Sequence, residues 1–415
     1  SQKSVAVGVI AVRADENLSI EVGRGILGQA VDVLGKSLIG QKYATDRRMA
    51  LDTLPLGIVS RKKVDKPLYT GLILTDLMVP LGKGQRELVI GDRKTGKSYF
   101  LMQAILAQVE AGSVCIYAAI GKKRAEIMRT VDFFMEKKVM DKVVVVAASS
   151  QDGAGEIFLC PYTAMAIAEY FRDLGQDVLV VLDDMSVHAK FYRQLSLISK
   201  KFPGRDSYPG DIFHIHSKLL ERAGNFVVAN GREASITCLP AVETVQGDIT
   251  GYIPTNLMSM TDGHIYVDSE LFFKGRRPAV NPFVSVTRVG YQTQSKLRRD
   301  ASRSLYELLN NYEKTQSFLR FGAELGENSR QVLALGDKVL KFFDQPYYLV
   351  VPEKLQIWLL AGLMSGVWDG VGTDKWTENY LTRAKTRETI DGLVTGADNM
   401  EKIYVSLRPV WEGLI

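Results

Sequence analysis

Hydrophobic residues follow two patterns along the chain, and the change falls near residue 87. In the N-terminal stretch they alternate with other residues, and Val5, Val7 and Val9 fall on one face, which predicts a half-buried strand. Residues 23–80 are rich in glycine and turn residues, which is typical of short strands and tight loops. Because two strands do not form a stable domain alone, we expect this end to pack against another part of the molecule.

Continuous apolar runs after residue 87 predict a parallel sheet, because such runs are typical of strands buried on both faces. They read ELVI, SVCIYAAI, KVVVVAAS, DVLVVLD and SITCLPAV, with amphipathic segments between them. From about residue 295 the strand signal largely stops, and a helical region begins with Leu305, Leu308, Leu309 and Tyr312. The 415 residues are enough for two or three domains. We therefore predict an α/β fold followed by helices.

Composition narrows the classes of protein to consider. The net charge of +5 comes from mixed charges without a basic block, which does not indicate nucleic-acid binding. No apolar run approaches the roughly 20 residues that span a bilayer. Three cysteines, without metal-ligand spacing, argue against a disulfide framework. We expect Cys115, Cys160 and Cys238 to be reduced core residues of an intracellular protein.

Residues 91–98, GDRKTGKS, fit the phosphate-binding pattern G-x-x-x-x-G-K-[ST] between a predicted strand and a predicted helix. Glycine lets the backbone approach phosphate, N–H groups at the helix N-terminus face the anion, and the lysine reaches the outer phosphates. The residues expected to contact the nucleotide are Gly91, Asp92, Arg93, Lys94, Thr95, Gly96, Lys97 and Ser98. The loop therefore predicts nucleotide binding.

A magnesium ligand is expected at the end of a neighbouring strand. Asp183 is the first carboxylate after VLVVL, and with the hydroxyl of Ser98 it is our candidate for holding Mg²⁺. Asp184 follows directly. A helix N-cap is the competing interpretation, chiefly for Asp184.

Long segments in the same order resemble the alpha subunit of F-type ATP synthase. Among them are GDRKTGKS, IYAAIGKKRA, CPYTAMAIAEYFRDLGQDVLVVLDDMSVHAKFYRQ, FPGRDSYPGDIFHIHSKLLERAG and LPAVETVQGDITGYIPTN, and the similarity runs from about residue 23 almost to the C-terminus. The resemblance implies three domains. We assign residues 1–22 to a β (crown) remnant, 23–294 to a RecA-like nucleotide-binding domain and 295–415 to a C-terminal helical domain.

The resemblance also implies an assembly. In this family three alpha and three beta subunits alternate in a ring around a rotating gamma subunit, with a peripheral stalk and delta subunit, and ATP synthesis or hydrolysis is coupled to ion transport. The beta subunits carry the main catalytic sites, whereas the alpha subunits hold Mg²⁺ with ATP or ADP that is not turned over. We expect the chain at the cytoplasmic face of a bacterial plasma membrane, attached through the complex; the matrix face of the mitochondrial inner membrane is the alternative.

The residue that should activate water differs from that of catalytic relatives. They carry glutamate in a G-E-R triplet after the strand VCIYAAIG, whereas here the triplet is GKK and Lys122 fills the position. A lysine is cationic at neutral pH and does not act as that base. Glu126, one helical turn further on, is expected to be a solvated surface residue. The sequence therefore predicts that the nucleotide is held without hydrolysis.

The resemblance assigns three further residues. Arg288, in VSVTRVG, matches the arginine finger of the alpha subunit, which stabilises phosphoryl charge in the neighbouring beta site. A structural ion pair is the competing interpretation. Phe272 and Arg277, in FFKGRRPA, match positions near the bound nucleotide, and ordinary core packing is the alternative for Phe272.

The chain departs from the family pattern at several points. About 22 residues precede GRGILG, too few for the crown barrel, which we interpret as reduced, absent or missing. Lys94 stands where the family usually has glutamine, and Thr287 stands where the motif has serine. Phe342 and Phe343 occupy the segment expected to contact adenine, which leaves those contacts open.

Two other functions stay open. An active hexameric ring ATPase of the export-motor or RNA-translocase type is disfavoured by Lys122, and a structural spacer without nucleotide is disfavoured by the intact loop. The histidines lack ligand spacing as a set, so we expect core or interface residues and not a metal site. We predict HIH, with His214 and His216, to lie on a strand with both side chains on one face.

Overall fold

The computed structural model describes residues 8–10, 12, 17–40, 42–228, 231–320, 326–370 and 372–404. The predicted strand through Val5 and Val7 lies outside these residues, and Val9 is exposed and belongs to no strand. Further on, β1 (Ser19–Val22) pairs with β3 (Arg47–Ala50) in antiparallel fashion. This pair packs on helix α4, as expected for two strands that need support.

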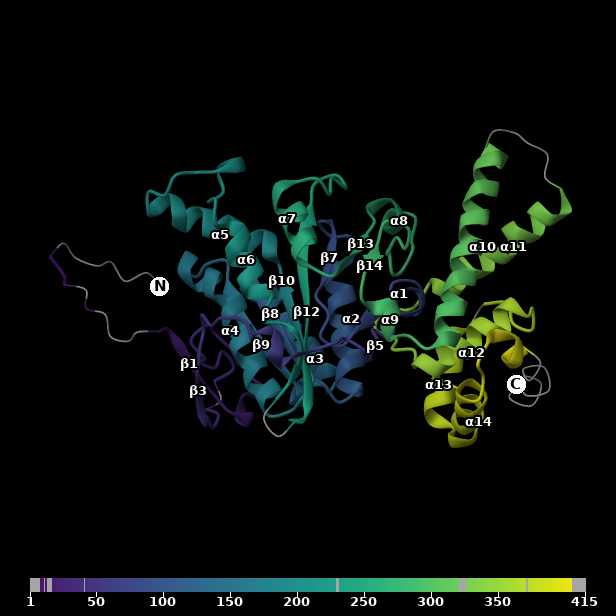
Figure 1. Cartoon of the computed structure of the whole chain (residues 1–415), viewed down its shortest axis with the longest axis horizontal. Helices are drawn as coiled ribbons and strands as arrows, with labels where there is room; N and C mark the ends of the chain where they lie inside the picture. Colours follow the sequence, from purple (N-terminus) through teal and green to yellow (C-terminus); the bar gives the residue numbers. More distant parts are fainter. Residues whose placement is uncertain are drawn as a thin grey trace.

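A large parallel sheet forms the centre of the molecule (Figure 1). Its main path runs through β14 (Val286–Thr287), β13 (Gly263–Val267), β7 (Glu87–Asp92), β12 (Glu233–Thr244), β10 (Val178–Asp183), β8 (Val114–Lys122), β9 (Val143–Ser149) and β2 (Ala30–Val31). Neighbours from β13 to β2 are parallel, and β14 is antiparallel to β13. All five predicted runs are strands of this sheet, so the α/β prediction is confirmed.

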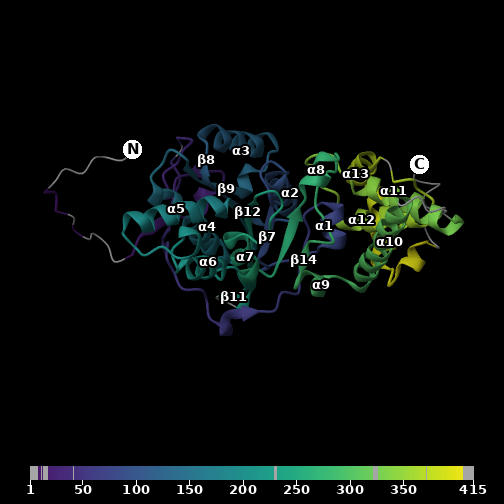
Figure 2. The same cartoon turned by 90° about the horizontal axis from the view of Figure 1, so that it is seen from above.

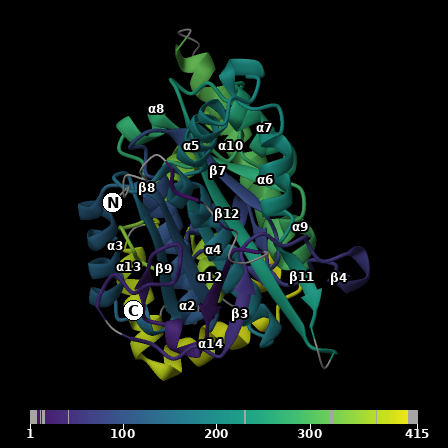
Figure 3. The same ribbon diagram turned by 90° about the vertical axis from the view of Figure 1, so that its left-hand side faces the viewer.

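Short strands extend the edges of this architecture. β11 (Gly224–Val227) pairs antiparallel with β12 and also with β4 (Arg61–Lys62). A separate ribbon joins β5 (Pro67–Leu68) to β6 (Leu81–Gly82). Figure 3 shows the long β12 within the sheet, with α3 to one side and α6 and α7 to the other.

Helices cover both faces of the sheet (Figure 2). One face packs on α2 (Lys97–Glu110) and α3 (Arg124–Glu136), and the other packs on α4 (Ala154–Asp173), α5 (Met185–Ile198), α6 (Ile212–Leu220) and α7 (Tyr252–Met260). Three shorter helices are α1 (Ile73–Met78), α8 (Ser269–Phe273) and α9 (Gly290–Thr293). Because the strands are buried on both faces, their apolar residues run without polar interruption.

After β14 the regular elements that the structure describes are helices, which lie to one side of the sheet (Figure 1). They are α10 (Lys296–Arg320), α11 (Glu327–Phe343), α12 (Glu353–Met364), α13 (Thr373–Thr382) and α14 (Ala384–Thr395). The predicted apolar face is buried at Leu305, Leu309 and Tyr312. Within the described ranges, no helix is long and apolar enough to cross a bilayer.

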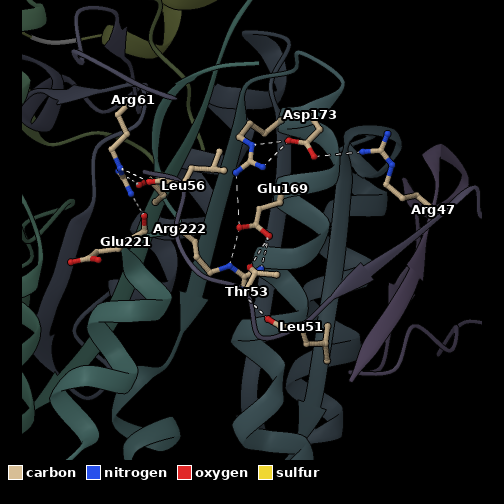
Figure 4. A network of polar contacts seen from close by, with 11 residues as sticks. Arg47, Leu51, Thr53, Leu56, Arg61, Glu169, Asp173, Glu221 and Arg222 are labelled. Carbon is tan, nitrogen blue, oxygen red and sulfur yellow. Dashed lines mark hydrogen bonds and ion pairs between the residues drawn. The ribbon is translucent and has the colours of Figure 1, made fainter. Parts of the chain in front are cut away.

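A buried ion pair joins the N-terminal segment to the sheet domain (Figure 4). Arg222 donates from Nε to Glu169 Oε1 at 3.0 Å and from Nη2 to Oε2 at 2.7 Å. Its third nitrogen donates to the carbonyl oxygen of Leu51 at 2.7 Å. Since every charged group here has a partner, the cost of burial is offset and the network fixes how these segments sit together.

The prediction of a strand for HIH is wrong, because these residues lie on α6. The buried residues of this helix are Ile212, His216, Leu219 and Leu220, which is helical spacing. His214 is exposed, so the two histidines face different surroundings. The three cysteines are free and buried, as predicted.

Candidate nucleotide-binding site

The loop after β7 has the backbone that the phosphate pattern requires. β7 ends at Asp92 and α2 begins at Lys97. Gly96 has a φ of 104°, a left-handed conformation that favours glycine. A Cβ at Gly91 would lie 2.3 Å from the carbonyl oxygen of Val267 on the neighbouring strand. Glycine is therefore required at both positions, once by conformation and once by close packing.

Lys97 is buried within this loop. Its Nζ donates hydrogen bonds to the carbonyl oxygens of Gly91 at 2.9 Å and Asp92 at 2.6 Å. Burial lowers the pKa of Lys97, while the carboxylates of Asp184 and Glu243 favour its charge. Phosphate oxygens would be stronger partners for this ammonium than neutral carbonyl groups.

Of the other loop residues, some form hydrogen bonds within the protein and others are exposed. The side chain of Asp92 accepts from the Thr244 hydroxyl at 2.6 Å and from the Gly247 N–H at 2.8 Å, so it ties the loop to the turn after β12. The hydroxyl of Thr95 donates to the Asp92 carbonyl oxygen at 2.7 Å. Arg93, Lys94 and Ser98 are exposed and line the same cavity.

Asp183 lies at the end of β10, beside the start of α2. Its Oδ2 accepts from Ser98 Oγ at 3.2 Å and from the Tyr117 hydroxyl at 2.6 Å. A hydroxyl and a carboxylate in contact are oxygen ligands that suit Mg²⁺ bound to a nucleotide. Among the described residues, no group of three or more His, Cys, Asp and Glu side chains could hold a metal. The ion would take its remaining ligands from phosphate oxygens and water.

Lys122 forms an ion pair with the other oxygen of the Asp183 carboxylate. Its Nζ lies 2.8 Å from Asp183 Oδ1. Burial opposes the charge of Lys122, but the attraction of Asp183 outweighs it and raises its pKa. Gly121, at a φ of 63°, sits at an irregularity in the pairing of β8 with β9 just before Lys122. A side chain at Gly121 would meet Val187 at 2.6 Å, so glycine permits this turn.

The carboxylates nearby have distinct roles. Asp184 caps α5 by accepting the Ser186 N–H at 2.6 Å, which is the N-cap alternative considered from the sequence. Burial, with Asp183 and Glu243 close by, raises its pKa to about 6. Glu243 lies near the end of β12, paired with Gly91, and sequence reasoning missed it because no loop motif includes it. Glu126 is exposed on α3, as predicted.

Phe272 and Arg277 lie together beside the loop. The guanidinium of Arg277 stacks 3.9 Å from the centroid of the Phe272 ring, and its Nε donates to the Tyr347 hydroxyl at 2.6 Å. A Cβ at Gly96 would lie 3.8 Å from the Phe272 ring. Phe272 is half-buried, packs against the core and also lines the cavity.

An aromatic wall that the sequence did not reveal continues from these residues. Tyr99 meets Tyr347 edge-on with ring centroids 4.6 Å apart, and Phe133 lies 4.5 Å from Tyr348. All four line the cavity, which has a volume of about 880 Å³. Flat aromatic faces of this kind can stack on a nucleotide base.

Phe342 and Phe343, by contrast, are buried in the core away from this cavity. Phe342 packs edge-on against Trp368 with centroids 5.6 Å apart. The segment 342–348 therefore contributes its first two aromatic residues to the core and its last two, Tyr347 and Tyr348, to the cavity. The sequence left the adenine contacts open because of Phe342 and Phe343, and it did not point to Tyr347 and Tyr348.

Arg288 lies at the opposite end of the sheet strands from the loop. Its strand β14 pairs Thr287 with Gly263, which in turn pairs with Glu87 at the start of β7. Gly91 lies four positions after Glu87 on β7, a distance of roughly 13 Å at about 3.3 Å per residue. Arg288 is exposed, and its side chain forms no hydrogen bond or ion pair with a residue that the structure describes. The structure does not bring it to its own loop.

Glu87 lies near Arg288 but is a buried carboxyl group. Its Oε2 accepts from Gln85 Nε2 at 2.7 Å, and its Oε1 has no hydrogen-bond partner. Burial raises the pKa of Glu87 well above its usual value, which favours the neutral, protonated form. Thr287 keeps the hydroxyl that serine would supply, and donates it to the Pro80 carbonyl oxygen at 2.9 Å.

Comparison with known proteins shows which family shares this arrangement. Residues 71–287 match the model of the ATP synthase alpha/beta family, nucleotide-binding domain, and residues 294–391 match the ATP synthase alpha/beta chain, C terminal domain. ATP synthase subunit alpha of Petrotoga mobilis is 41% identical over 412 residues, which cover 98% of this chain and 82% of the relative. The chain belongs to the ATP synthase alpha subunit family.

Two further relatives are also ATP synthase alpha subunits. ATP synthase subunit alpha of Clostridium acetobutylicum is 41% identical over 366 residues, covering 88% of this chain and 72% of that protein. The protein of Mannheimia succiniciproducens is 38% identical over 410 residues, covering 95% and 80%. The resemblance read from the motifs is therefore confirmed, and the loop lies within the nucleotide-binding domain of the ATP synthase alpha/beta family.

Proposed function

We propose that this chain is a ring subunit of an ATP synthase that holds ATP or ADP without hydrolysing it. One observation supports the proposal: Lys122, which by the resemblance replaces the water-activating glutamate, lines the cavity and is ion-paired with Asp183 at 2.8 Å. An ammonium group is a hydrogen-bond donor and cannot accept the proton of the attacking water. Ser98 and Asp183 would hold Mg²⁺ when it accompanies the nucleotide, and the ion would neutralise phosphate charge.

We also propose that Arg288 acts in the site of a neighbouring beta subunit. Its exposure and its lack of a polar partner among the described residues support a role outside this chain. An arginine finger needs a guanidinium that can reach phosphate and is not committed to an internal ion pair. The ring of three alpha and three beta subunits, the gamma and delta contacts, and attachment at the cytoplasmic face of a bacterial membrane belong to the same proposal.

The division into residues 1–22, 23–294 and 295–415 also remains a proposal. It is supported by the change from sheet to helices after β14.

Phosphate release by the isolated full chain tests the absence of hydrolysis. We expect the wild type to release phosphate from ATP no faster than a Lys97→Ala variant, in which the phosphates lose their cationic partner. Glu243→Gln tests whether a different carboxylate acts as the base, because Glu243 also lies next to the loop. Turnover above the Lys97→Ala level that Glu243→Gln abolishes would make Glu243 a catalytic base and end the proposal.

A further inference from the structure

The carboxylate expected to face a metal ion is already paired with a side-chain cation. Lys122 holds Oδ1 of Asp183 at 2.8 Å, while Tyr117 and Ser98 donate to Oδ2. Asp183 is only 3% exposed, so water cannot easily replace these partners. A metal ion that approached this carboxylate at Oδ1 would have to displace the ammonium group.

Lys122 is also placed to touch a ligand. It is 25% exposed and lines the cavity that contains the phosphate loop. An ammonium group has three N–H donors, and within the described part of the chain only Asp183 accepts from this one. Two donors are therefore free for phosphate oxygens.

The charge of the cavity favours an anion with a high negative charge. Basic side chains along its wall outnumber acidic ones by eight to four. A nucleotide without Mg²⁺ carries two more negative charges than its Mg²⁺ complex. An unpaired Asp183 would repel such a nucleotide, and the repulsion would be strong because the site is shielded from solvent. Lys122 removes that repulsion and adds a positive group.

We propose that Lys122 is a built-in cation of this site, so that the chain binds ATP and ADP almost as tightly without Mg²⁺ as with it. The inference rests on the proposed nucleotide-binding function, because it concerns the same cavity. Lys122 therefore determines whether the nucleotide binds well without Mg²⁺. An ordinary loop of this type prefers the Mg²⁺ complex, whereas this one would also bind the metal-free nucleotide well.

Calorimetric titration of the full chain with ADP and with ATP tests this, once in excess Mg²⁺ and once in excess EDTA. For the wild type we expect Kd values in the two conditions to agree within about threefold. Lys122→Gln can still donate to Asp183 but has no charge, and we expect its Kd to rise at least about tenfold in EDTA and much less in Mg²⁺. Lys122→Arg keeps the charge and should restore the wild-type ratio.

Lys123→Gln is the matched control, since it removes the same charge from the next position of the cavity wall. It should leave the ratio of the two Kd values unchanged. A wild-type Kd that rises tenfold or more in EDTA would overturn the inference while leaving nucleotide binding intact. The same shift in Lys123→Gln would also overturn it, because overall charge would then suffice. Failure to bind in both conditions would contradict the proposed function and this inference with it.

Discussion

Positively charged side chains have different surroundings at the two ends of strand β7. At the carboxyl end, Lys97 donates to two carbonyl oxygens of its own loop and Lys122 pairs with Asp183. At the amino end, Arg288 is exposed, and its side chain has no hydrogen bond or ion pair with any residue that the structure describes. The carboxyl group of Glu87, which interacts electrostatically with Arg288, is buried, and burial raises its pKa well above its usual value.

This difference supports the separate roles proposed for these cations. Cations that are held in place by their own chain are preorganised for a ligand bound within that chain, because little ordering remains to be done. A cation on the surface that lacks an internal partner suits a site completed by another subunit. In this proposal, strand β7 separates the nucleotide site at its carboxyl end from a subunit contact at its amino end.

The largest expected effect comes from Arg288→Lys, which keeps the charge but loses the planar, bidentate guanidinium. Arginine fingers contribute roughly 10³–10⁵ in rate, so we expect hydrolysis by the assembled ring to fall by at least about a hundredfold. Nucleotide content of this chain and ring assembly should be unchanged. Turnover per ring, assembly and bound nucleotide are measured on one preparation, with Arg303→Lys on α10 as the exposed control.

A structural role for Arg288 predicts the reverse pattern. Rings would then assemble poorly, and those that formed would hydrolyse ATP at nearly the normal rate. Normal turnover per assembled Arg288→Lys ring would remove the finger from the account.

At the other end of β7, Lys97→Ala should weaken nucleotide binding. Hydrogen bonds to charged groups contribute about 1.5–3 kcal/mol, so we expect affinity to fall by roughly 10- to 150-fold. Lys94→Ala, which removes an exposed lysine from the same loop, should cause a much smaller loss. Titration calorimetry on both variants measures the difference, and equal losses would show that general charge, not the buried position of Lys97, binds the phosphates.

Much of the fold and the loop could be predicted because their signals are local. Continuous apolar runs gave the strands of the sheet, and glycine spacing gave the loop at 91–98. HIH failed because three residues that alternate look like a strand, whereas the spacing from Ile212 to His216 and Leu219 is helical. A longer window over these apolar positions would have corrected it.

The rest of the site depends on contacts between distant segments. Tyr347 reaches Tyr99 only because the helical part packs beside α2, and no pattern near either residue records this. The pairing of Lys122 with Asp183 depends on adjacent strands and on the turn at Gly121. The sequence placed each residue at a strand end but could not show that they neutralise each other.

A smaller effect, from Glu87→Gln, tests whether Arg288 has a hidden ion-pair partner. Because burial raises the pKa of Glu87, folded and unfolded chains differ in bound protons once the pH rises above about 4.5. The unfolded chain then releases a proton that the folded chain keeps, so wild-type stability falls by about 1.4 kcal/mol per pH unit until Glu87 ionises. Glutamine has no proton to lose. The stability of the variant relative to the wild type should therefore increase between about pH 5 and about pH 7.

Urea unfolding at several pH values measures this difference, and Glu126→Gln on the exposed face of α3 is the control. If Glu87 were ionised and paired with Arg288, Glu87→Gln would instead be less stable than the wild type at neutral pH.

The most direct test of the central claim is the fate of ATP bound to this chain in the assembled ring. Rings carrying wild-type chain or Lys97→Ala are loaded with ATP labelled at the γ-phosphate, chased with unlabelled ATP, and analysed for label still in ATP. We predict that wild-type rings retain labelled ATP through many turnovers and that Lys97→Ala rings lose it. Release of all label as phosphate at the turnover rate, in both kinds of ring, would show that this chain does not hold nucleotide intact.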